Sequence, residues 1–546
     1  MNTRGLPLLL LAAALALGWN LNGYRLLDPD EGRNAEVARE MARSNDYLIP
    51  HLDGLPYLDK PIVYFAAAAL AMEALGPTEA AARLPAHLAT LATVALLVWF
   101  GRRRWGPDAG WLAGLAFATM PLTLAYAHTA IFDSTLAFFT TAAIVCFFLQ
   151  RTTLAWAAIA AGALTKGPVA IAIPLAVMVP YALATGRPLR RLFSLSGLAA
   201  FAVVGLPWFI AITLRVPEFP HYAFVRETFE RFTTPRFHRT APFWYYLPII
   251  PVAAFPWIVP ASARLTAWRT TWAKRRDDAT ADSLWLAAWV LGPLALFTLN
   301  QSKLPQYMLP LMPAFALAAA RTLTTAGPRI AWRPYVALAT ALGIILVAFP
   351  RGLLSTVPLT PAERAAIPPA ALTLGIVLLA SAACQAAAAA RRSTGLAALG
   401  YAMVVMAVPF ATGPLMAAVG DDRSAARLSA AIRAAEQTRG DVLGIAAYPP
   451  SLPFYLRSTV AVATAHGEEL TSNYIAFYHD RLRTFPDSPL RPVDSWAVIL
   501  ASCPAPTVFV TRAGNGSVRA RLAALPLIID DGRYAAYGPC RAHTGG

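Results

Sequence analysis

Residues 84–104 read LPAHLATLATVALLVWFGRRR, an apolar run that ends in three consecutive arginines. A helix of about 20 apolar residues crosses the hydrocarbon core of a bilayer, and Lys and Arg gather in the cytoplasmic loops. The run therefore predicts a membrane span whose C-terminal end faces the cytoplasm.

Apolar runs of this kind recur through most of the chain. Hydrophobic residues fill 57% of the 546 positions and charged residues only 14%, whereas soluble domains carry about 25% charge. The sequence therefore predicts an α-helical polytopic membrane protein. We expect about thirteen transmembrane helices, near residues 5–22, 84–101, 111–128, 134–150, 153–165, 168–184, 193–214, 243–261, 282–299, 304–321, 332–350, 370–390 and 395–417.

Segment 62–76 determines the topology, because it is apolar but short. If it lies along the outer membrane surface instead of spanning, the basic clusters all fall on the cytoplasmic side. These clusters are Arg102–Arg104, Arg151, Arg187–Arg191, Lys274–Arg276 and Arg391–Arg392. We therefore expect the N-terminus inside, and the loop 23–83 and the C-terminal tail outside.

The first apolar run, Leu6 to Trp19, has an alternative interpretation as a cleaved signal peptide. It continues into a polar cluster without a separate cleavage site, which favours an uncleaved first span. The net charge of +16 is explained by the short cytoplasmic loops. We therefore expect the lipid bilayer, and no nucleic acid, as a partner.

The chain changes character near residue 420. Short β-branched runs at 441–446, 459–463, 497–500 and 507–510 alternate with helical stretches such as 423–438, which predicts a small α/β domain. We expect a transmembrane domain over 1–419, with outer loops 23–83 and 215–242, and a soluble periplasmic domain over 420–546. Cys503 and Cys540 could pair if that domain is periplasmic.

Acidic and cationic side chains gather on the predicted outer face. They belong to Asp28-Pro29-Asp30-Glu31-Gly32-Arg33, Tyr57-Leu58-Asp59-Lys60-Pro61, Ile131-Phe132-Asp133-Ser134, Lys166-Gly167-Pro168 and Gln301-Ser302-Lys303-Leu304-Pro305-Gln306-Tyr307. Such a face suits a polyprenyl-phosphate sugar donor, whose tail stays in the bilayer and whose phosphate gains charge as the sugar leaves. Arg33, Lys60 and Lys303 could stabilise that phosphate. Asp30 and Asp133 could position or deprotonate an acceptor, or bind a divalent cation.

Several of these residues also have structural interpretations. Asp30 could cap the helix that follows it, whereas a carboxylate between apolar spans, such as Asp133, is costly unless it has a function. Lys166 and Lys303 could be membrane-interface anchors. His221 and His238 are weak metal candidates, because no close ligand spacing links them.

The motifs together resemble a known family. Asp30-Glu31-Gly32-Arg33, Ala35–Met41, Tyr57-x-x-Lys60-Pro61, Ala82–Pro85, Leu164–Gly167, Ser302–Pro310 and Ser451–Leu456 are similar to those of the lipid A 4-amino-4-deoxy-L-arabinose transferases. That family belongs with the protein O-mannosyltransferases among the GT-C membrane glycosyltransferases. The resemblance covers nearly the whole chain.

The resemblance implies transfer of aminoarabinose from undecaprenyl phosphate to a lipid A phosphate on the periplasmic face of the bacterial inner membrane. Asp30 and Asp133 would be the catalytic carboxylates, and Arg33, Lys60 and Lys303 would bind the donor phosphate. Glu31, Tyr57, Lys166 and Tyr307 would line the substrate pocket. Asp59 and His238 would contact a divalent metal, with Zn, Mg and Mn all open.

The sequence departs from the family at Asp59 and Ile62, where Glu and Pro are usual, and at Asn34 and Phe132. These changes leave open another polyprenyl-phosphate sugar, with a glycan or protein acceptor. A lipid-linked-sugar transporter is an alternative from another class. It would carry polar groups throughout its spans and an internal repeat, and the sequence shows neither. We expect a monomer.

Overall fold

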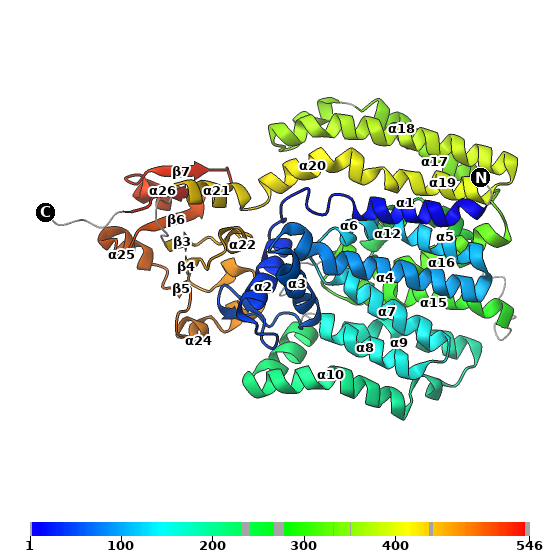
Figure 1. Cartoon of the computed structure of the whole chain (residues 1–546), viewed down its shortest axis with the longest axis horizontal. Helices are drawn as coiled ribbons and strands as arrows, with labels where there is room; N and C mark the ends of the chain where they lie inside the picture. The colour runs from blue at the N-terminus through cyan, green and yellow to red at the C-terminus, as the bar shows by residue number, and fades with distance from the viewer. Residues whose placement is uncertain are drawn as a thin grey trace. The chain divides into compact units, whose positions relative to one another are not determined.

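The computed structural model describes residues 3–230, 241–266, 278–330, 332–349, 351–435 and 441–540. The chain divides into two compact units (Figure 1). Residues 1–21 and 85–415 form a helical unit, and residues 22–84 and 416–546 form a mixed unit of helices and strands. The segment 23–83, predicted as an outer loop, thus groups with the C-terminal region.

The helical unit is built from apolar helices that coincide with the predicted spans. Its helices are α1 (Leu6–Gly18), α4 (Glu79–Trp105, which begins in the mixed unit), α5 (Pro107–Ala118), α6 (Pro121–Ala127), α7 (Asp133–Phe148), α8 (Thr152–Lys166), α9 (Val169–Thr185), α10 (Leu195–Arg215), α12 (Tyr246–Ala253), α13 (Ile258–Thr266), α15 (Asp278–Leu299), α16 (Met312–Thr325), α17 (Trp332–Val347), α18 (Pro361–Arg391), α19 (Thr394–Met406) and α20 (Val408–Asp422, which ends in the mixed unit). Short helical turns join them: η1 (Thr3–Gly5), η2 (Leu189–Leu192), η3 (His221–Glu230), η6 (Pro305–Leu311) and η7 (Arg351–Ser355).

Two predicted spans are broken. The span near 111–128 forms α5 and α6, bent by 64°, and the span near 243–261 forms α12 and α13, bent by 117°. Pro121 and Pro256 lie at the breaks, where a residue without a backbone N–H interrupts the helical hydrogen bonds. In the described residues, five helices are long and apolar enough to cross a membrane, or seven with each bent pair as one span. The count of thirteen stays a prediction.

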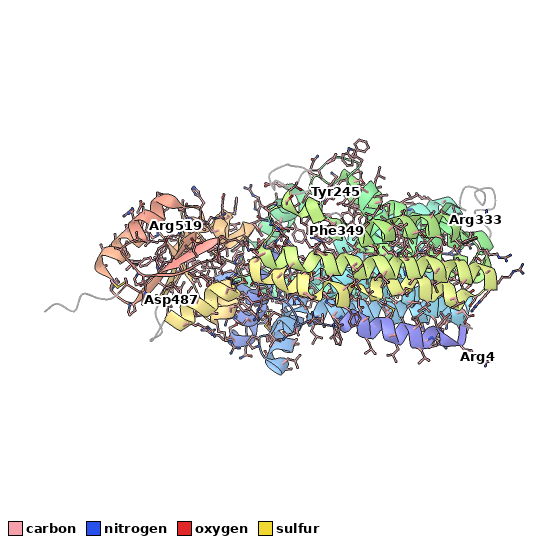
Figure 2. The ribbon with its side chains drawn as sticks, turned by 90° about the horizontal axis from the view of Figure 1, so that it is seen from above. Arg4, Tyr245, Arg333, Phe349, Asp487 and Arg519 are labelled. Carbon is pink, nitrogen blue, oxygen red and sulfur yellow. A yellow bond between two sulfur atoms is a disulfide. The ribbon has the colours of Figure 1, made fainter. Side chains whose placement is uncertain are left out.

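The outer surface of the helical unit is apolar. On α10, Leu195 is 87% exposed and Leu214 is 78% exposed. Apolar side chains this exposed mark a surface that faces lipid. Figure 2 shows Arg4 and Arg333 at one end of the helical unit, and Tyr245 and Phe349 nearer the other end. The predicted topology likewise assigns these pairs to the cytoplasmic and outer sides.

The mixed unit contains two helices from the segment after the first span, α2 (Asp30–Ser44) and α3 (Val63–Leu75). α3 confirms that 62–76 is helical. β1 (His51–Leu52) and β2 (Leu55–Pro56) form a small antiparallel hairpin between them.

The C-terminal region of the mixed unit forms a six-stranded sheet in the order β5-β4-β3-β6-β8-β7. The first four strands in this order are parallel, and β8 and β7 add antiparallel strands at one edge. The strands are β3 (Asp441–Ile445), β4 (Ala461–Ala463), β5 (Leu490–Arg491), β6 (Thr507–Arg512), β7 (Leu527–Asp530) and β8 (Tyr534–Tyr537). The helices are α21 (Ala426–Ala435), α22 (Leu452–Leu456), η8 (Glu468–Leu470), α23 (Asn473–Phe477), α24 (His479–Arg483), α25 (Ser495–Ser502) and α26 (Gly516–Leu522).

The prediction of an α/β domain is confirmed for this region, but the strand predicted at residues 497–500 is wrong. Residues 497–500 belong to α25, where Trp496 is buried and Val498 is exposed. A short apolar run has no length or periodicity that separates a strand from a helix, and packing of the Trp496 ring decides between them here. The run 441–446 corresponds to β3, and 507–510 to β6.

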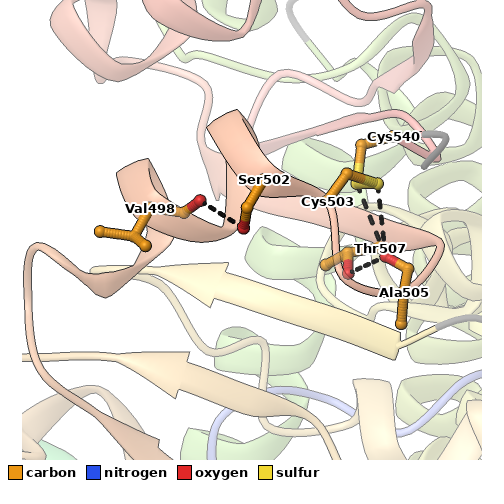
Figure 3. Close-up of a disulfide and its surroundings, with 6 residues drawn as sticks. All are labelled: Val498, Ser502, Cys503, Ala505, Thr507 and Cys540. Atoms are coloured by element: carbon orange, nitrogen blue, oxygen red, sulfur yellow. Dashed lines mark hydrogen bonds between the residues drawn. A yellow bond between two sulfur atoms is a disulfide. The ribbon is translucent and has the colours of Figure 1, made fainter. Parts of the chain in front are cut away.

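Cys503 and Cys540 form a disulfide, with their Cα atoms 6.0 Å apart (Figure 3). The bond links the C-terminal end of α25 to the segment after β8. The structure therefore contains the pairing that the sequence left open.

Candidate functional site

The helical unit carries an ion pair at one end of the α7–α8 hairpin. Asp133 is the first residue of α7 and Lys166 is the last residue of α8. The Lys166 Nζ donates to the Asp133 Oδ1 over 2.6 Å, and the side chains are only 14% and 4% exposed, respectively. The hairpin turns at Gln150 and Arg151, at its opposite end. The Asp133–Lys166 ion pair therefore lies at the end of the hairpin opposite Arg151.

Aromatic rings surround this ion pair. The Lys166 ammonium lies 5.3 Å from the centre of the Phe132 ring and 5.0 Å from that of Tyr307. Tyr307 belongs to η6, and the neighbouring Gln306 accepts a hydrogen bond from the Tyr126 hydroxyl at 3.0 Å. The structure therefore brings together Asp133, Lys166 and Tyr307, which the sequence placed in separate motifs.

Lys303 is a buried cation in the segment before η6. Its side chain donates to the Asn300 carbonyl oxygen over 2.7 Å, and the residue is 8% exposed. Within the described part of the chain, no carboxylate lies within ion-pair distance of it. A buried ammonium is stabilised by an anion, so this position suits an anionic ligand group.

The mixed unit carries a second carboxylate–cation pair on α2. Asp30 is the first residue of the helix, and Pro29 holds the N-cap position, so the interpretation of Asp30 as the cap is wrong. The Arg33 Nη2 donates to the Asp30 Oδ1 over 2.6 Å. Asp30 is 47% exposed and Arg33 only 11%. The carboxylate is therefore open to a ligand, while the guanidinium is fixed.

The C-terminal region of the same unit orients Arg33. Its Nη1 donates to the carbonyl oxygen of Thr471 at 2.8 Å and to the Thr471 hydroxyl at 3.1 Å. The guanidinium lies 6.0 Å from the Tyr57 ring centre, and in the described residues its buried Nε has no hydrogen-bond partner. Burial opposes the charge, but Tyr57, Asp30 and Asp59 raise the Arg33 pKa overall, so the cation is maintained.

Asp59 and Lys60 follow β2. The Asp59 carboxylate is buried and accepts backbone N–H bonds from Asn473 at 3.0 Å and Tyr474 at 2.8 Å, at the start of α23. The Lys60 ammonium donates to the Asp59 carbonyl oxygen. In the described residues, no group of three His, Cys, Asp or Glu side chains could hold a metal ion. His238 lies outside the described residues.

Glu31 is part of a buried network that sequence reasoning did not find. Both of its carboxylate oxygens accept from Arg83, at 2.9 and 3.0 Å, and both side chains are almost completely buried. Arg83 also donates to the carbonyl oxygens of Tyr24 and Arg25. These contacts hold the chain before α2, and the predicted place of Glu31 in a substrate pocket stays a prediction.

The start of α2 also packs closely on residue 451. A Cβ added at Gly32 would lie 2.6 Å from the Ser451 backbone nitrogen and 2.2 Å from the Asp28 Oδ1. The Ser451 hydroxyl donates to the Asp28 Oδ2 at 2.9 Å, and burial raises the pKa of Asp28 to about 7. The motifs Asp30–Arg33 and Ser451–Leu456, which carry the family resemblance, were the available sequence signal for this contact.

Comparisons with known proteins show what the chain is similar to. Residues 59–213 match the dolichyl-phosphate-mannose-protein mannosyltransferase family. The chain is 32% identical to the undecaprenyl phosphate-α-4-amino-4-deoxy-L-arabinose arabinosyl transferase of Aeromonas salmonicida, over 59% of this chain and 61% of that protein. A second transferase of this name, from Proteus mirabilis, is also 32% identical, over 58% of this chain and 59% of that protein. The matches thus span about three fifths of these relatives.

The structural similarity extends further. The crystal structure of ArnT from Cupriavidus metallidurans bound to undecaprenyl phosphate superposes with a TM-score of 0.85 and 25% identity, covering 100% of both chains. The apo form of that protein gives a TM-score of 0.83 at 24% identity, over 98% of both chains.

The helical fold with its small mixed sheet matches the GT-C fold of that protein. Within that class, the chain is similar to the undecaprenyl phosphate-α-4-amino-4-deoxy-L-arabinose arabinosyl transferases.

Proposed function

We propose that the protein transfers 4-amino-4-deoxy-L-arabinose from undecaprenyl phosphate to a phosphate of lipid A. The observation that carries the proposal is the buried Asp133–Lys166 pair beside Tyr307, with the buried Lys303 in the segment before η6. Carboxylates and fixed cations at one end of a lipid-facing helical unit suit a phosphate leaving group. The names of the relatives, and the undecaprenyl phosphate bound to the similar structure, supply the donor.

In the proposed reaction, an acceptor oxygen forms a bond to the anomeric carbon of the sugar as the bond from that carbon to the donor phosphate oxygen breaks. The electron pair of the broken bond stays on the undecaprenyl phosphate. Fixed cations stabilise the charge that develops on such a leaving group, and they need no reorganisation during the reaction. We assign this role to Lys303 in the helical unit and to Arg33 and Lys60 in the mixed unit. Attack opposite the leaving group inverts the anomeric centre.

The acceptor determines the role of Asp30. A lipid A phosphate oxygen is already anionic and needs little deprotonation, so the half-exposed Asp30 carboxylate would position the acceptor. With a hydroxyl acceptor, the same carboxylate would take the proton as general base. Asp133 would orient the Lys166 ammonium against the rings of Phe132 and Tyr307, and Tyr57 would line the pocket beside Arg33.

We place the protein in the bacterial inner membrane, with the mixed unit and the site on the periplasmic side. The positive clusters at the opposite ends of the helices support this orientation. The disulfide between Cys503 and Cys540 supports it independently, because structural disulfides persist in oxidising compartments such as the periplasm.

We also propose that Asp59 and His238 bind a divalent cation, which could be Zn, Mg or Mn. Of these two ligands, only Asp59 lies in the described residues. Both of its carboxylate oxygens already accept backbone N–H bonds. The proposed roles above therefore rest on the protein side chains alone. Elemental analysis of the purified protein and of His238→Ala tests the proposal. A stoichiometric metal that the variant lacks supports it, and an unchanged content removes His238 as a ligand.

The function is tested by mass spectrometry of lipid A from cells with and without the protein, in a host that makes undecaprenyl-phosphate aminoarabinose. We expect lipid A to gain the mass of one aminopentose, and Asp30→Ala to abolish that gain. Unchanged lipid A, with the protein present in the membrane, would overturn the aminoarabinose assignment. Screening other polyprenyl-phosphate sugars with glycan and protein acceptors would then follow.

A further inference from the structure

The helical unit has an apolar groove that the proposed reaction does not use. It has a volume of about 840 Å³ and is lined by α1, α4 and α5. Figure 1 shows these three helices beside one another in the helical unit. Leu11 and Ala14 line it from α1, Leu91 and Ala95 from α4, and Trp111 from α5.

The length of the groove fits one lipid leaflet. Its lining residues on α4 run from Leu91 to Arg103, a helical rise of about 18 Å. Half the hydrocarbon core of a bilayer is about 15 Å thick. The groove is therefore long enough for the acyl chain of a lipid in one leaflet. Its walls, apart from the arginines and tryptophans, offer hydrocarbon side chains to a ligand.

Two arginines lie at one end of this groove. Arg102 and Arg103 both line it and are exposed. The exposed Trp99 and the partly buried Trp111 line the same end. Within the part of the chain that the structure describes, neither arginine has a carboxylate partner. The next residue, Arg104, differs, because it donates to the Asp282 carboxylate at 3.0 Å. Tryptophan and arginine together are typical of the depth at which lipid headgroups lie.

The packing of α4 on α5 fixes the position of Arg102. A Cβ added at Gly110 would lie 2.2 Å from the Arg102 Cγ, so the arginine side chain crosses α5 where there is no side chain. Its guanidinium then lies 4.9 Å from the Trp111 ring centre. Stacking on a ring reduces the entropy that this cation would lose on binding an anion.

We propose that this groove binds an anionic phospholipid of the cytoplasmic leaflet. One acyl chain lies between α1 and α4, and the lipid phosphate contacts Arg102 and Arg103. The apolar walls select hydrocarbon, and the two cations without carboxylate partners select a negatively charged headgroup. The leaflet follows from the proposed orientation, and the site itself does not depend on the transfer reaction.

Native mass spectrometry of the purified full-length chain tests the proposal, with phosphatidylglycerol and phosphatidylethanolamine of identical acyl chains as probes. We expect one phosphatidylglycerol to stay bound at activation energies that remove phosphatidylethanolamine. Arg102→Gln/Arg103→Gln should weaken phosphatidylglycerol binding about tenfold or more, since a surface cation contributes about 1 kcal/mol to binding anionic lipid. Equal retention of the two lipids by the wild type would overturn the anionic preference.

A matched control separates the groove from general surface charge. Arg190→Gln/Arg191→Gln removes the same charge from exposed residues of η2, which do not line the groove. This control should keep the bound phosphatidylglycerol. If both double variants lose it equally, the headgroup site is wrong. Ala95→Phe or, from the other wall, Ala14→Phe should fill the groove and remove both lipids, and retention of lipid by both folded variants would overturn the acyl-chain site.

Discussion

The two carboxylate–cation pairs differ in how the chain builds them. Asp133 and Lys166 come from different helices, 33 residues apart; Asp133 is buried and the Lys166 side chain is only 14% exposed. Asp30 and Arg33 are one helical turn apart, and the carboxylate is half exposed. A buried pair loses much stability when one partner is removed, whereas an exposed pair contributes about 0–1 kcal/mol. Changes at the first pair should therefore affect folding and activity together, and changes at Asp30 should affect activity alone.

The largest effect is expected for Asp133→Asn. It leaves the buried Lys166 ammonium without its carboxylate, which should cost about 3–5 kcal/mol and lower the apparent Tm in detergent. Asp133→Asn/Lys166→Met should recover much of this Tm, because a methionine can pack on the Phe132 and Tyr307 rings, but it should not recover transfer.

Asp282→Asn is the matched control for this prediction. Asp282 is also buried and pairs with Arg104 at the arginine-rich end of the helices. It should lower the Tm but preserve the transfer rate of the folded protein. An active Asp133→Asn/Lys166→Met variant would show that the buried pair is only structural.

Asp30→Asn should lower the transfer rate at least about 100-fold, because the amide can neither take a proton nor position the acceptor by its charge. The Tm should change little. Initial rates with purified donor and lipid A, together with a thermal melt, check both expectations. Asp421→Asn, another exposed aspartate of the mixed unit, should leave the rate unchanged. Normal transfer by Asp30→Asn would remove Asp30 from the site.

The Lys303→Met substitution should weaken donor binding without lowering the stability of the protein. Loss of a charged hydrogen-bond donor to the donor phosphate should raise the KM for the undecaprenyl-phosphate sugar about tenfold or more. The Tm should stay constant or rise, since the substitution removes a buried cation. Lys303→Arg keeps the charge and should have a smaller effect on KM. A Tm loss with an unchanged KM would instead indicate a purely structural lysine.

The last prediction concerns the pH dependence of stability in the mixed unit. The pKa of Asp28 is raised to about 7 by burial, against about 3.9 in an unfolded chain. The folded state therefore binds the extra proton between these values, and stability falls as the pH rises from about 4 to about 7.

Asp28→Asn keeps an acceptor for the Ser451 hydroxyl and should make the Tm less dependent on pH over this window. The exposed Asp487→Asn variant of the same unit should keep the wild-type pH dependence. An unchanged profile in Asp28→Asn would exclude Asp28 as the titrating group. Thermal melts at pH 4.5, 6 and 8 measure these differences.

The amino-acid sequence by itself determined the apolar helices, the ends of those helices at which arginines gather, and the motifs of the candidate site. These depend on length, composition and short spacing, which are local properties of a chain. The helix at 495–502 was missed because a run of four apolar residues has no distinguishing period. Only the tertiary structure showed that Arg83 holds Glu31 and that Thr471, 438 residues away in the chain, orients Arg33. Such pairs form when folding brings donor and acceptor within about 3 Å, and no spacing in the sequence encodes that distance.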